Sequence, residues 1–439
     1  MTIRVAIRFL LSSFLSLLAC AATWAIQGSE TGIPNKVADL QFVVALSRHG
    51  VRSPTGRPDD RYSAAPWPQW DVPSAYLTSQ GYQLMKLFGA WDRVKFSGQG
   101  LFASSCCPAA AQVTILADSD QRTRETGKAL AEGMFPGCFI DVHAQAQGTA
   151  DPLFNLVSGL RPGDAALVTA AVAGRIGGDP NQLTEAYRPQ LAALDRVLAG
   201  CGHAPPSNKL RTSIFDIPAG LSPGTGGDPT ALTGPVIASS EFTENLLLEY
   251  TTGMSDANIG WGCVDSAKLR GLMQLATASW DYGYRTPTIA RIYASNLLYR
   301  IERSMEQNVT GKPAAGALSK PDDRLLIIVG HDSNIVTVAG ALGINWVIDG
   351  RVDDTPPGGV LLFEVWRPRD GGKPFVRLEY TAQTLEQMRY AQPLTSANPP
   401  AAAPIFMPGC SRHDLSCTWD GFSAALLNAT DPAYVSTLP

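Results

Sequence analysis

The sequence predicts an α/β fold with a mixed, largely parallel sheet flanked by helices and a mostly helical second domain inserted. Three continuous apolar runs, at residues 40–46, 112–117 and 324–329, are typical of strands buried on both faces. Helical patterns follow the second and third runs, at residues 121–134 and 333–342. Strand followed by helix, repeated along the chain, indicates an α/β sheet with parallel or mixed strands. Two runs that alternate more in polarity are expected to form later, less buried strands: residues 360–366 and 375–380.

The middle of the chain has a different pattern. Between residues 151 and 284 strand signals are sparse, and helical stretches at 182–198 and 239–250 alternate with Gly/Pro-rich loops such as 217–234. The 439 residues are also too many for one ordinary core. The predicted units are a signal peptide at 1–25, an α/β domain at 36–150 and 285–439, and a mostly helical insertion domain at 151–284.

The N-terminus is typical of an export signal. Two arginines precede an apolar stretch at residues 9–22, and small residues follow, with cleavage expected near Ala25. The stretch is shorter than the ~18–20 residues that a spanning helix needs, which argues against a membrane anchor. A further alternative is a lipoprotein signal, because residues 17–20 resemble a lipoprotein cleavage box that would leave a lipidated Cys20. We expect a periplasmic or secreted protein with no stable membrane insertion after cleavage.

Seven of the eight cysteines lie beyond the predicted signal peptide, and an oxidising compartment would let them form disulfides. Cys410 and Cys417 are close enough in sequence to close a small loop. Cys138 can pair with either Cys106 or Cys107. Two further cysteines either pair with each other or stay free: Cys201 and Cys263.

Composition and charge restrict the possible partners. Hydrophobic residues make up 45% of the chain and charged residues 17%, which is typical of a compact globular protein. The formal net charge is −4 and no basic stripe is present, so a nucleic-acid partner is not expected. An anionic ligand would need positive charge concentrated in a pocket. No CxxC motif pairs with a second CxxC or with an HxxxH, so we expect no metal and no cofactor.

A basic cluster follows the first apolar run. Arg48 and Arg52 place two guanidinium groups around the imidazole of His49. An unprotonated imidazole is a competent nucleophile toward phosphorus, and arginines bind phosphoryl oxygens through planar, paired hydrogen bonds. Gly50 would let the backbone approach a ligand closely. The pattern favours a phosphoryl-transfer site over a solvated basic loop.

The other two strand ends supply complementary groups. His331 can donate a hydrogen bond to a phosphoryl oxygen, and Asp332 can give a leaving alcohol its proton. A helix that begins near Ser333 would also turn its free N–H groups toward an anion. Arg122 could add a third guanidinium, although charged residues at that point also suit a helix N-terminus. The other histidines are interpreted as ordinary surface or hydrogen-bonded residues: His143, His203 and His413.

These clusters resemble the motifs of a known family. Residues 48–56 (RHGVRSPTG) and 330–334 (GHDSN) resemble the two active-site motifs of the histidine acid phosphatase family. Three further stretches resemble its bacterial periplasmic branch of phytases and acid phosphatases: DSDQRTRETG at 118–127, DTPPGG at 354–359 and QTLEQMR at 383–389. The similarity covers nearly the whole chain after the predicted signal peptide.

The resemblance implies a phosphomonoester hydrolase that acts at acidic pH through a covalent phosphohistidine. His49 would be the nucleophile and Asp332 the proton donor. The residues implied to hold the scissile phosphate are Arg48, Arg52, Arg122 and His331, with Thr55 close by. The family needs no metal, the implied substrate is phytate or a small sugar phosphate, and a monomer is expected. The disulfides that the resemblance favours are Cys107–Cys138 and Cys410–Cys417.

Two departures from the branch concern the substrate. Gly56 stands where phytases of this branch often carry a lysine, although Arg57 follows, and Glu241 stands where an apolar residue is more usual on a pocket-lining helix. An added carboxylate near a highly anionic ligand is unfavourable.

Two other hypotheses for the function are an exported protein that binds phosphorylated ligands without turnover and a mutase that shuttles phosphate between hydroxyls. The presence of both His49 and Asp332 argues against the binding protein. The export signal, the cysteine pattern and the His-Asp motif argue against the mutase.

Overall fold

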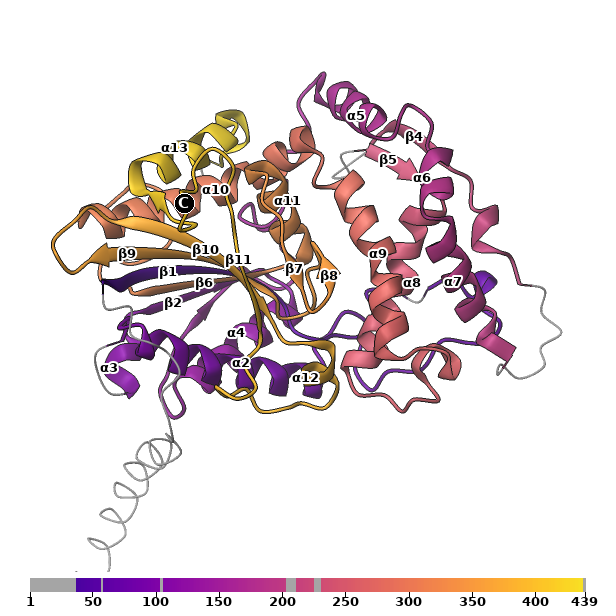
Figure 1. The fold of residues 1–439 in the computed structure, drawn as a ribbon, viewed down its shortest axis with the longest axis horizontal. Coiled ribbons are helices and arrows are strands. Elements are labelled where there is room, and N and C mark those ends of the chain that lie inside the picture. Colours follow the sequence, from indigo (N-terminus) through magenta and orange to yellow (C-terminus); the bar gives the residue numbers. More distant parts are fainter. Residues whose placement is uncertain (1–36, 57, 103–105, 203–210, 225–229, 437–439) are drawn as a thin grey trace, which may run out of the picture.

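A computed structural model of the protein describes residues 37–436 except residues 57, 103–105, 203–210 and 225–229. The predicted signal peptide, Cys20 and Arg57 therefore lie outside the described residues. A mixed sheet forms the centre of the fold (Figure 1). In spatial order its strands are β11 (Ala401–Pro404), β10 (Phe375–Ala382), β9 (Val360–Pro368), β1 (Ala38–Arg48), β6 (Leu325–Gly330), β2 (Val113–Ala117) and β3 (Val142–His143), with β12 (Cys417–Thr418) beside β10.

Strands β1, β6, β2 and β3 form the parallel part of the sheet. Arg48 at the end of β1 lies opposite Gly330 at the end of β6, and Ala117 at the end of β2 lies opposite Val329. The carboxyl ends of all three predicted strands therefore meet at one edge of the sheet, where ligands of α/β proteins bind.

The antiparallel part of the sheet begins at β9, which pairs with β1 on one side and with β10 on the other. The expectation that this strand is less buried is wrong, because seven consecutive residues from Val360 to Trp366 are buried. Leu361 and Phe363 pack into the core on one face of the sheet, and Leu362 packs into the core on the other. Strand β10 does alternate between buried and half-buried residues, as expected.

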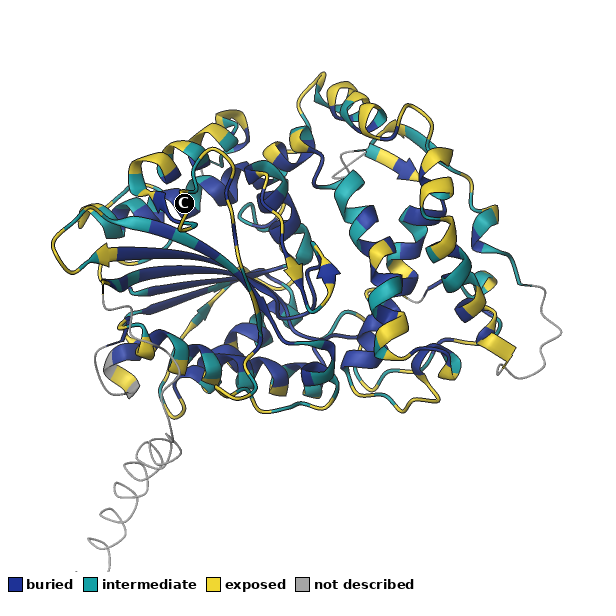
Figure 2. Ribbon diagram, viewed as in Figure 1, coloured by how far each residue is buried: buried dark blue, intermediate teal, exposed yellow. Residues whose placement is uncertain are grey.

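Helices cover both faces of the sheet (Figures 1 and 2). Phe42, Val44 and Leu46 of β1 pack with one set of helices, and Val43 and Ala45 pack with the other, as side chains alternate along a strand. The first set is α10 (Pro287–Thr310), α11 (Asp332–Leu342) and α13 (Trp419–Ala429). The second set is α2 (Ser79–Gly98), α3 (Cys106–Ala110) and α4 (Gln121–Met134).

A largely helical segment with its own core is inserted between β3 and α10. Its helices are α5 (Asp164–Arg175), α6 (Asn181–Ala186), α7 (Arg188–Leu198), α8 (Pro235–Thr251) and α9 (Ser266–Gly283). The predicted helix at 182–198 is divided at Tyr187, where α7 begins with Pro189 in its first turn. The Gly/Pro-rich stretch at 217–234 contains a hairpin of β4 (Gly220–Pro223) and β5 (Thr230–Thr233). We propose that this domain ends near residue 284, between α9 and α10.

The last part of the chain adds α12 (Leu385–Arg389) and a hairpin of β7 (Val347–Ile348) and β8 (Arg351–Val352).

Three disulfides join Cys107 to Cys138, Cys201 to Cys263, and Cys410 to Cys417. The first and third are those that the resemblance favours, and the second settles a pairing that the sequence left open. The side chain of Cys106 is not among those described. Within the described part of the chain, no helix combines the length and apolarity needed to cross a bilayer.

Candidate active site

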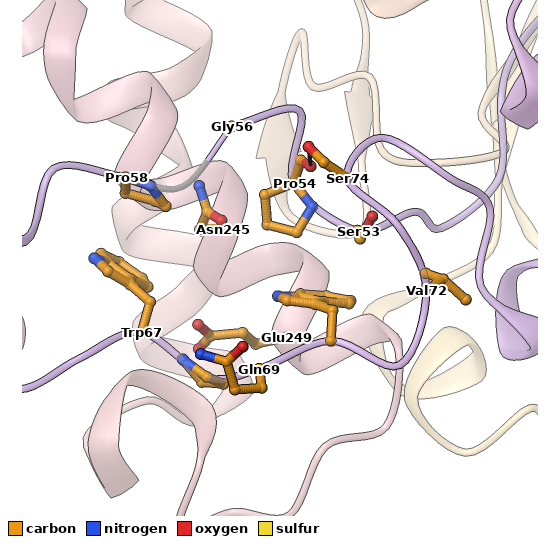
Figure 3. A pocket seen from close by; sticks show the side chains of 12 residues that line it. Ser53, Pro54, Gly56, Pro58, Trp67, Gln69, Val72, Ser74, Asn245 and Glu249 are labelled. Atoms are coloured by element: carbon orange, nitrogen blue, oxygen red, sulfur yellow. Dashed lines mark hydrogen bonds between the residues drawn. The ribbon is translucent and has the colours of Figure 1, made fainter.

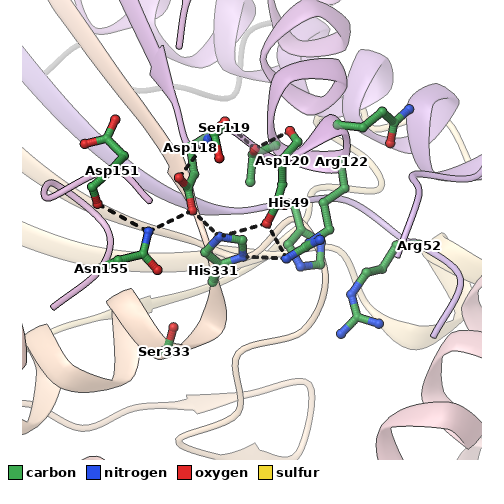
Figure 4. Close-up of polar contacts among 12 residues, drawn as sticks. His49, Arg52, Asp118, Ser119, Asp120, Arg122, Asp151, Asn155, His331 and Ser333 are labelled. Carbon is green, nitrogen blue, oxygen red and sulfur yellow. Dashed lines mark hydrogen bonds and ion pairs between the residues drawn. The ribbon is translucent and has the colours of Figure 1, made fainter. Parts of the chain in front are cut away.

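A cavity of about 500 Å³ opens where the carboxyl ends of β1, β2 and β6 meet (Figure 4). Six of the seven residues predicted for the site line it: His49, Arg52, Thr55, Arg122, His331 and Asp332. The seventh, Arg48, is 4% exposed and bonds to Asp332 at the wall of the cavity. The structure therefore brings all seven residues together.

The backbone on both sides of His49 holds the imidazole in place. The His49 N–H donates to the Gly330 carbonyl (3.0 Å), and the His49 carbonyl accepts from the Gly358 N–H (2.9 Å). Gly50 serves packing rather than ligand approach, because a Cβ there would lie 2.8 Å from the Met85 side chain of α2. His49 is thus clamped between the end of β6, the loop before β9 and helix α2.

The ring nitrogens of His49 have distinct roles. Nδ1 lies 2.9 Å from the Gly50 carbonyl oxygen. A carbonyl oxygen can only accept, so Nδ1 carries the proton and Nε2 keeps its lone pair. Burial lowers the pKa of His49 well below its ordinary value, and the charges of Arg52, Arg48 and Arg122 lower it further. The imidazole therefore stays neutral, and nucleophilic, in mildly acidic solution.

Arg48 and Arg52 share a carboxylate that the sequence did not single out for the site. Glu244 of α8 accepts from the Nη2 of Arg48 and, at 2.9 Å, from the Nη2 of Arg52. Arg48 also donates to the Thr355 carbonyl (2.6 Å) and pairs with Asp332 (2.9 Å). Burial lowers the pKa of Arg48, but Asp332 and Glu244 outweigh it and raise the pKa overall. Arg52 lines the cavity and Arg48 lies at its wall, so these contacts hold both guanidinium groups in fixed positions.

Asp332 begins α11, and its carboxylate is held at both oxygens. Oδ1 accepts from the Ser333 N–H (2.8 Å), and Oδ2 pairs with Arg48 (2.9 Å). Burial raises the pKa of Asp332, while Arg48, Arg52 and His331 lower it more strongly, so the pKa lies below its ordinary value. Asp332 is therefore a carboxylate, the form that can accept a proton.

A second polar group surrounds His331. Its Nε2 lies 2.7 Å from Asp118, and its Nδ1 lies 3.4 Å from the Nη2 of Arg122. Arg122 only donates, so Nδ1 accepts and Nε2–H donates to Asp118. Asp120 in turn pairs with Arg122 at 2.6 Å. These contacts fix both the ring of His331 and the guanidinium of Arg122, at the ends of β6 and β2.

Among the described residues, the group that could hold a cation consists of Asp118, Asp120 and His331. The ligand atoms of Asp118, Asp120 and His331 lie within 4.8 Å of one another. Both carboxylates already have partners, His331 for Asp118 and Arg122 for Asp120. A cation would have to displace those contacts.

The two residues that depart from the branch's pattern, Glu241 and Gly56, do not line this cavity. Glu241 is exposed on α8, and the carboxylate that enters the cavity is Glu244, one turn later. Gly56 lines a smaller neighbouring cavity instead. The sequence signal for Glu244 was its place in the helix that resembles the branch's pocket-lining helix. The signal for Asp118 and Asp120 was their place directly after a buried strand.

Comparisons with known proteins agree with this site. Residues 39–172 and 227–381 match the model of the histidine phosphatase superfamily (branch 2). Phytase AppA of Escherichia coli is 36% identical over 408 residues, which cover 90% of this chain and 93% of that protein. Glucose-1-phosphatase of Salmonella typhimurium is 30% identical over 378 residues, which cover 84% of this chain and 87% of that protein.

Solved structures show the same fold. Hafnia alvei phytase in complex with tartrate matches with a TM-score of 0.82 and 35% identity, over 92% of this chain and 99% of that chain. The same phytase in complex with myo-inositol hexakis sulphate matches with a TM-score of 0.80 and 34% identity, over the same shares of both chains. The chain therefore belongs to branch 2 of the histidine phosphatase superfamily, as a histidine acid phosphatase similar to bacterial phytases and glucose-1-phosphatases.

Proposed function

We propose that the chain hydrolyses phosphomonoesters in two steps through a phosphohistidine at Nε2 of His49. The observation that carries the proposal is a neutral imidazole with its Nδ1 proton held by Gly50, its Nε2 lone pair unused and three arginines around it. In the first step the Nε2 lone pair attacks phosphorus and the bond to the alcohol oxygen breaks. In the second step water attacks phosphorus, the bond to Nε2 breaks and inorganic phosphate leaves.

Asp332 moves the protons in both steps. It gives its proton to the leaving alcohol oxygen and takes one from the attacking water. It must therefore be protonated when substrate is bound, although Arg48, Arg52 and His331 lower its pKa. A bound phosphoryl group adds negative charge beside Arg48 and so offsets the charge that holds this pKa down. Acidic solution favours the same protonated form.

The arginines supply the charge that the transferring phosphoryl group needs. Arg48, Arg52 and Arg122 can donate to its non-bridging oxygens, with Thr55 at the rim of the cavity. The Nε2–H of His331 is already used at Asp118, so His331 joins these donors when its Nδ1 also carries a proton. Pre-arranged donors of this kind stabilise charge that develops in the transition state without a cost in reorganisation. The site therefore needs no bound cation for this chemistry.

The proposed substrates are phytate and small sugar phosphates. Relatives are named for phytate and for glucose 1-phosphate, and a related phytase structure holds an inositol hexakis sulphate. The cavity of about 500 Å³ is large enough for one phosphorylated ring. We also propose that the protein acts as a monomer in the periplasm or outside the cell, where its three described disulfides are stable.

The test is turnover and trapping with His49→Ala beside the wild-type chain. Phytate, glucose 1-phosphate and p-nitrophenyl phosphate are assayed at pH 5. An alkaline quench with a phosphate-labelled substrate follows the covalent step, because the P–N bond of phosphohistidine survives in base and hydrolyses in acid. The wild type should turn over and retain label, and the variant should do neither. Binding of phosphorylated ligands by the wild type without turnover would instead identify a binding protein.

A further inference from the structure

Figure 3 shows a second cavity, of about 210 Å³. It lies next to the active site, because the loop after β1 and helix α8 contribute residues to both. Its walls include the indoles of Trp67 and Trp70, the ring of Pro54, and the polar side chains of Asn245 and Glu249. None of the described residues that line it carries a positive charge. Among these described residues a phosphate ester would meet no cation, so they suit a different ligand chemistry from that of the active site.

The loop after β1 and helix α8 lie between the two cavities, and each contributes different residues to each cavity. On α8, Glu244 faces the active site, whereas Asn245 and Glu249 line the smaller cavity together, because residues four apart lie on one face of a helix. The loop after β1 is divided in the same way. Arg52 and Thr55 line the active site. The loop residues on the other side are Ser53, Pro54 and Gly56.

Glu249 offers the smaller cavity an unused hydrogen-bonding group. Its side chain is 1% exposed, and Oε2 accepts from the Gly260 N–H at 2.9 Å. Oε1 has no hydrogen-bond partner among the described residues. Burial raises the pKa of Glu249 to about 8, with the Gly260 N–H as a smaller opposing effect. Below that pH the carboxyl is neutral, and since Oε2 accepts, the O–H on Oε1 can donate.

The aromatic wall is rigid. Trp67 stacks on Phe242 with ring centroids 6.2 Å apart and planes at 6°, and lies 4.9 Å from Trp261. Indole faces bind the C–H faces of saturated rings, whereas hydroxyl groups need donors and acceptors at the ring edge. Asn245 provides its Oδ1 as an acceptor, while its Nδ2 donates one N–H to the Glu241 carbonyl (2.7 Å). The volume is below that of cavities for drug-sized ligands and leaves room for one ring.

We propose that this cavity binds one uncharged, hydroxylated six-membered ring, a monosaccharide or a cyclitol. The ring lies against an indole face and directs hydroxyl groups at Glu249 and Asn245. The proposal does not depend on the catalytic roles given above, because the two cavities have separate linings apart from the loop and helix between them.

The test is a titration of the full chain with glucose and, separately, with myo-inositol, followed by tryptophan fluorescence and calorimetry at pH 5. Saturating inorganic phosphate keeps the active site occupied. One of the two rings should bind saturably with a dissociation constant in the roughly millimolar range, and the tighter one identifies the ring class. Glu249→Leu and Trp70→Leu should each weaken binding about tenfold.

Glu249→Gln supplies a variant that keeps the fold, because its amide still accepts from Gly260 and still donates into the cavity. It should bind the ring at pH 5 and at pH 9, whereas the wild type should lose affinity above pH 8 as Glu249 ionises. Glu241→Gln, an exposed carboxyl on the same helix, is the matched control and should bind like the wild type. The proposal is overturned if neither ring binds saturably, if the Leu variants bind unchanged, or if tetramethylammonium binds more tightly than both rings.

Discussion

Glu244→Gln should make the enzyme more sensitive to inhibition by inorganic phosphate. The Glu244 carboxylate occupies one side of the Nη2 atoms of Arg48 and Arg52, at 2.9 Å from the latter. A phosphate bound by the same guanidinium groups lies roughly 5 Å from that carboxylate. Two unit charges at that distance repel by about 2–3 kcal/mol at an effective dielectric constant of about 20–40. The Glu244 side chain is 23% exposed, and screening by solvent and salt lowers the repulsion to about 1–2 kcal/mol.

That repulsion corresponds to about a tenfold lower inhibition constant for phosphate in the variant. Glutamine keeps the shape and an acceptor oxygen, and Arg48 keeps its contacts with Asp332 and Thr355. The assay measures competitive inhibition of p-nitrophenyl phosphate hydrolysis at pH 5. Glu241→Gln removes the same charge three residues earlier on the helix and should change the constant less than about twofold. An unchanged or higher inhibition constant in Glu244→Gln would show that Glu244 positions the arginines rather than opposing the anion.

Three further outcomes follow from the site and the core. Asp332→Asn should lower kcat by about 10²–10⁴-fold on sugar phosphates and far less on p-nitrophenyl phosphate, whose leaving group needs little protonation; equal losses on both would assign Asp332 a positional role. Activity should persist in excess EDTA, because three arginines face the phosphate and Arg122 already engages Asp120; activity lost to EDTA and restored by zinc or magnesium would contradict this. Burial raises the pKa of Asp92 to about 7 and that of Glu249 to about 8. Between about pH 5 and 8 the folded chain therefore holds protons on these two groups that the unfolded chain has released. The free energy of unfolding consequently falls as pH rises through this range. Glu249→Gln should flatten that fall in urea denaturation, and parallel profiles for the two proteins would refute it; the lowered pKa of His49 acts in the opposite direction, only below about pH 6.5.

The strands and helices that position the site were predictable because their signals are local. The runs at 40–46, 112–117 and 324–329 lie within or overlap β1, β2 and β6, and the pattern at 121–134 coincides with α4. The basic and acidic groups directly follow those runs, so parallel pairing alone predicts that they meet.

The parts that were missed depend on how distant segments pack. Whether Glu241 or Glu244 enters the cavity depends on the rotation of α8 about its axis against the loop after β1, and both glutamates lie in one helical turn. Burial of β9 depends on its place between β1 and β10, since a central strand is covered on both faces. The Cys201–Cys263 disulfide likewise depends on the approach of two segments 62 positions apart.

The edge at which β1, β2 and β6 end should make assembly of the site a late event in folding, because its residues come from distant parts of the chain. His331 meets Asp118 across 213 positions of chain, and Arg48 meets Glu244 across 196. No short fragment of the chain therefore contains a working site. These contacts can form only when segments that are far apart in the sequence have come together. Contacts of such separation make folding slow. Recovery of hydrolysis after dilution from denaturant should consequently lag behind recovery of helical circular dichroism, and enzymatic activity is a direct reporter of complete assembly of the chain.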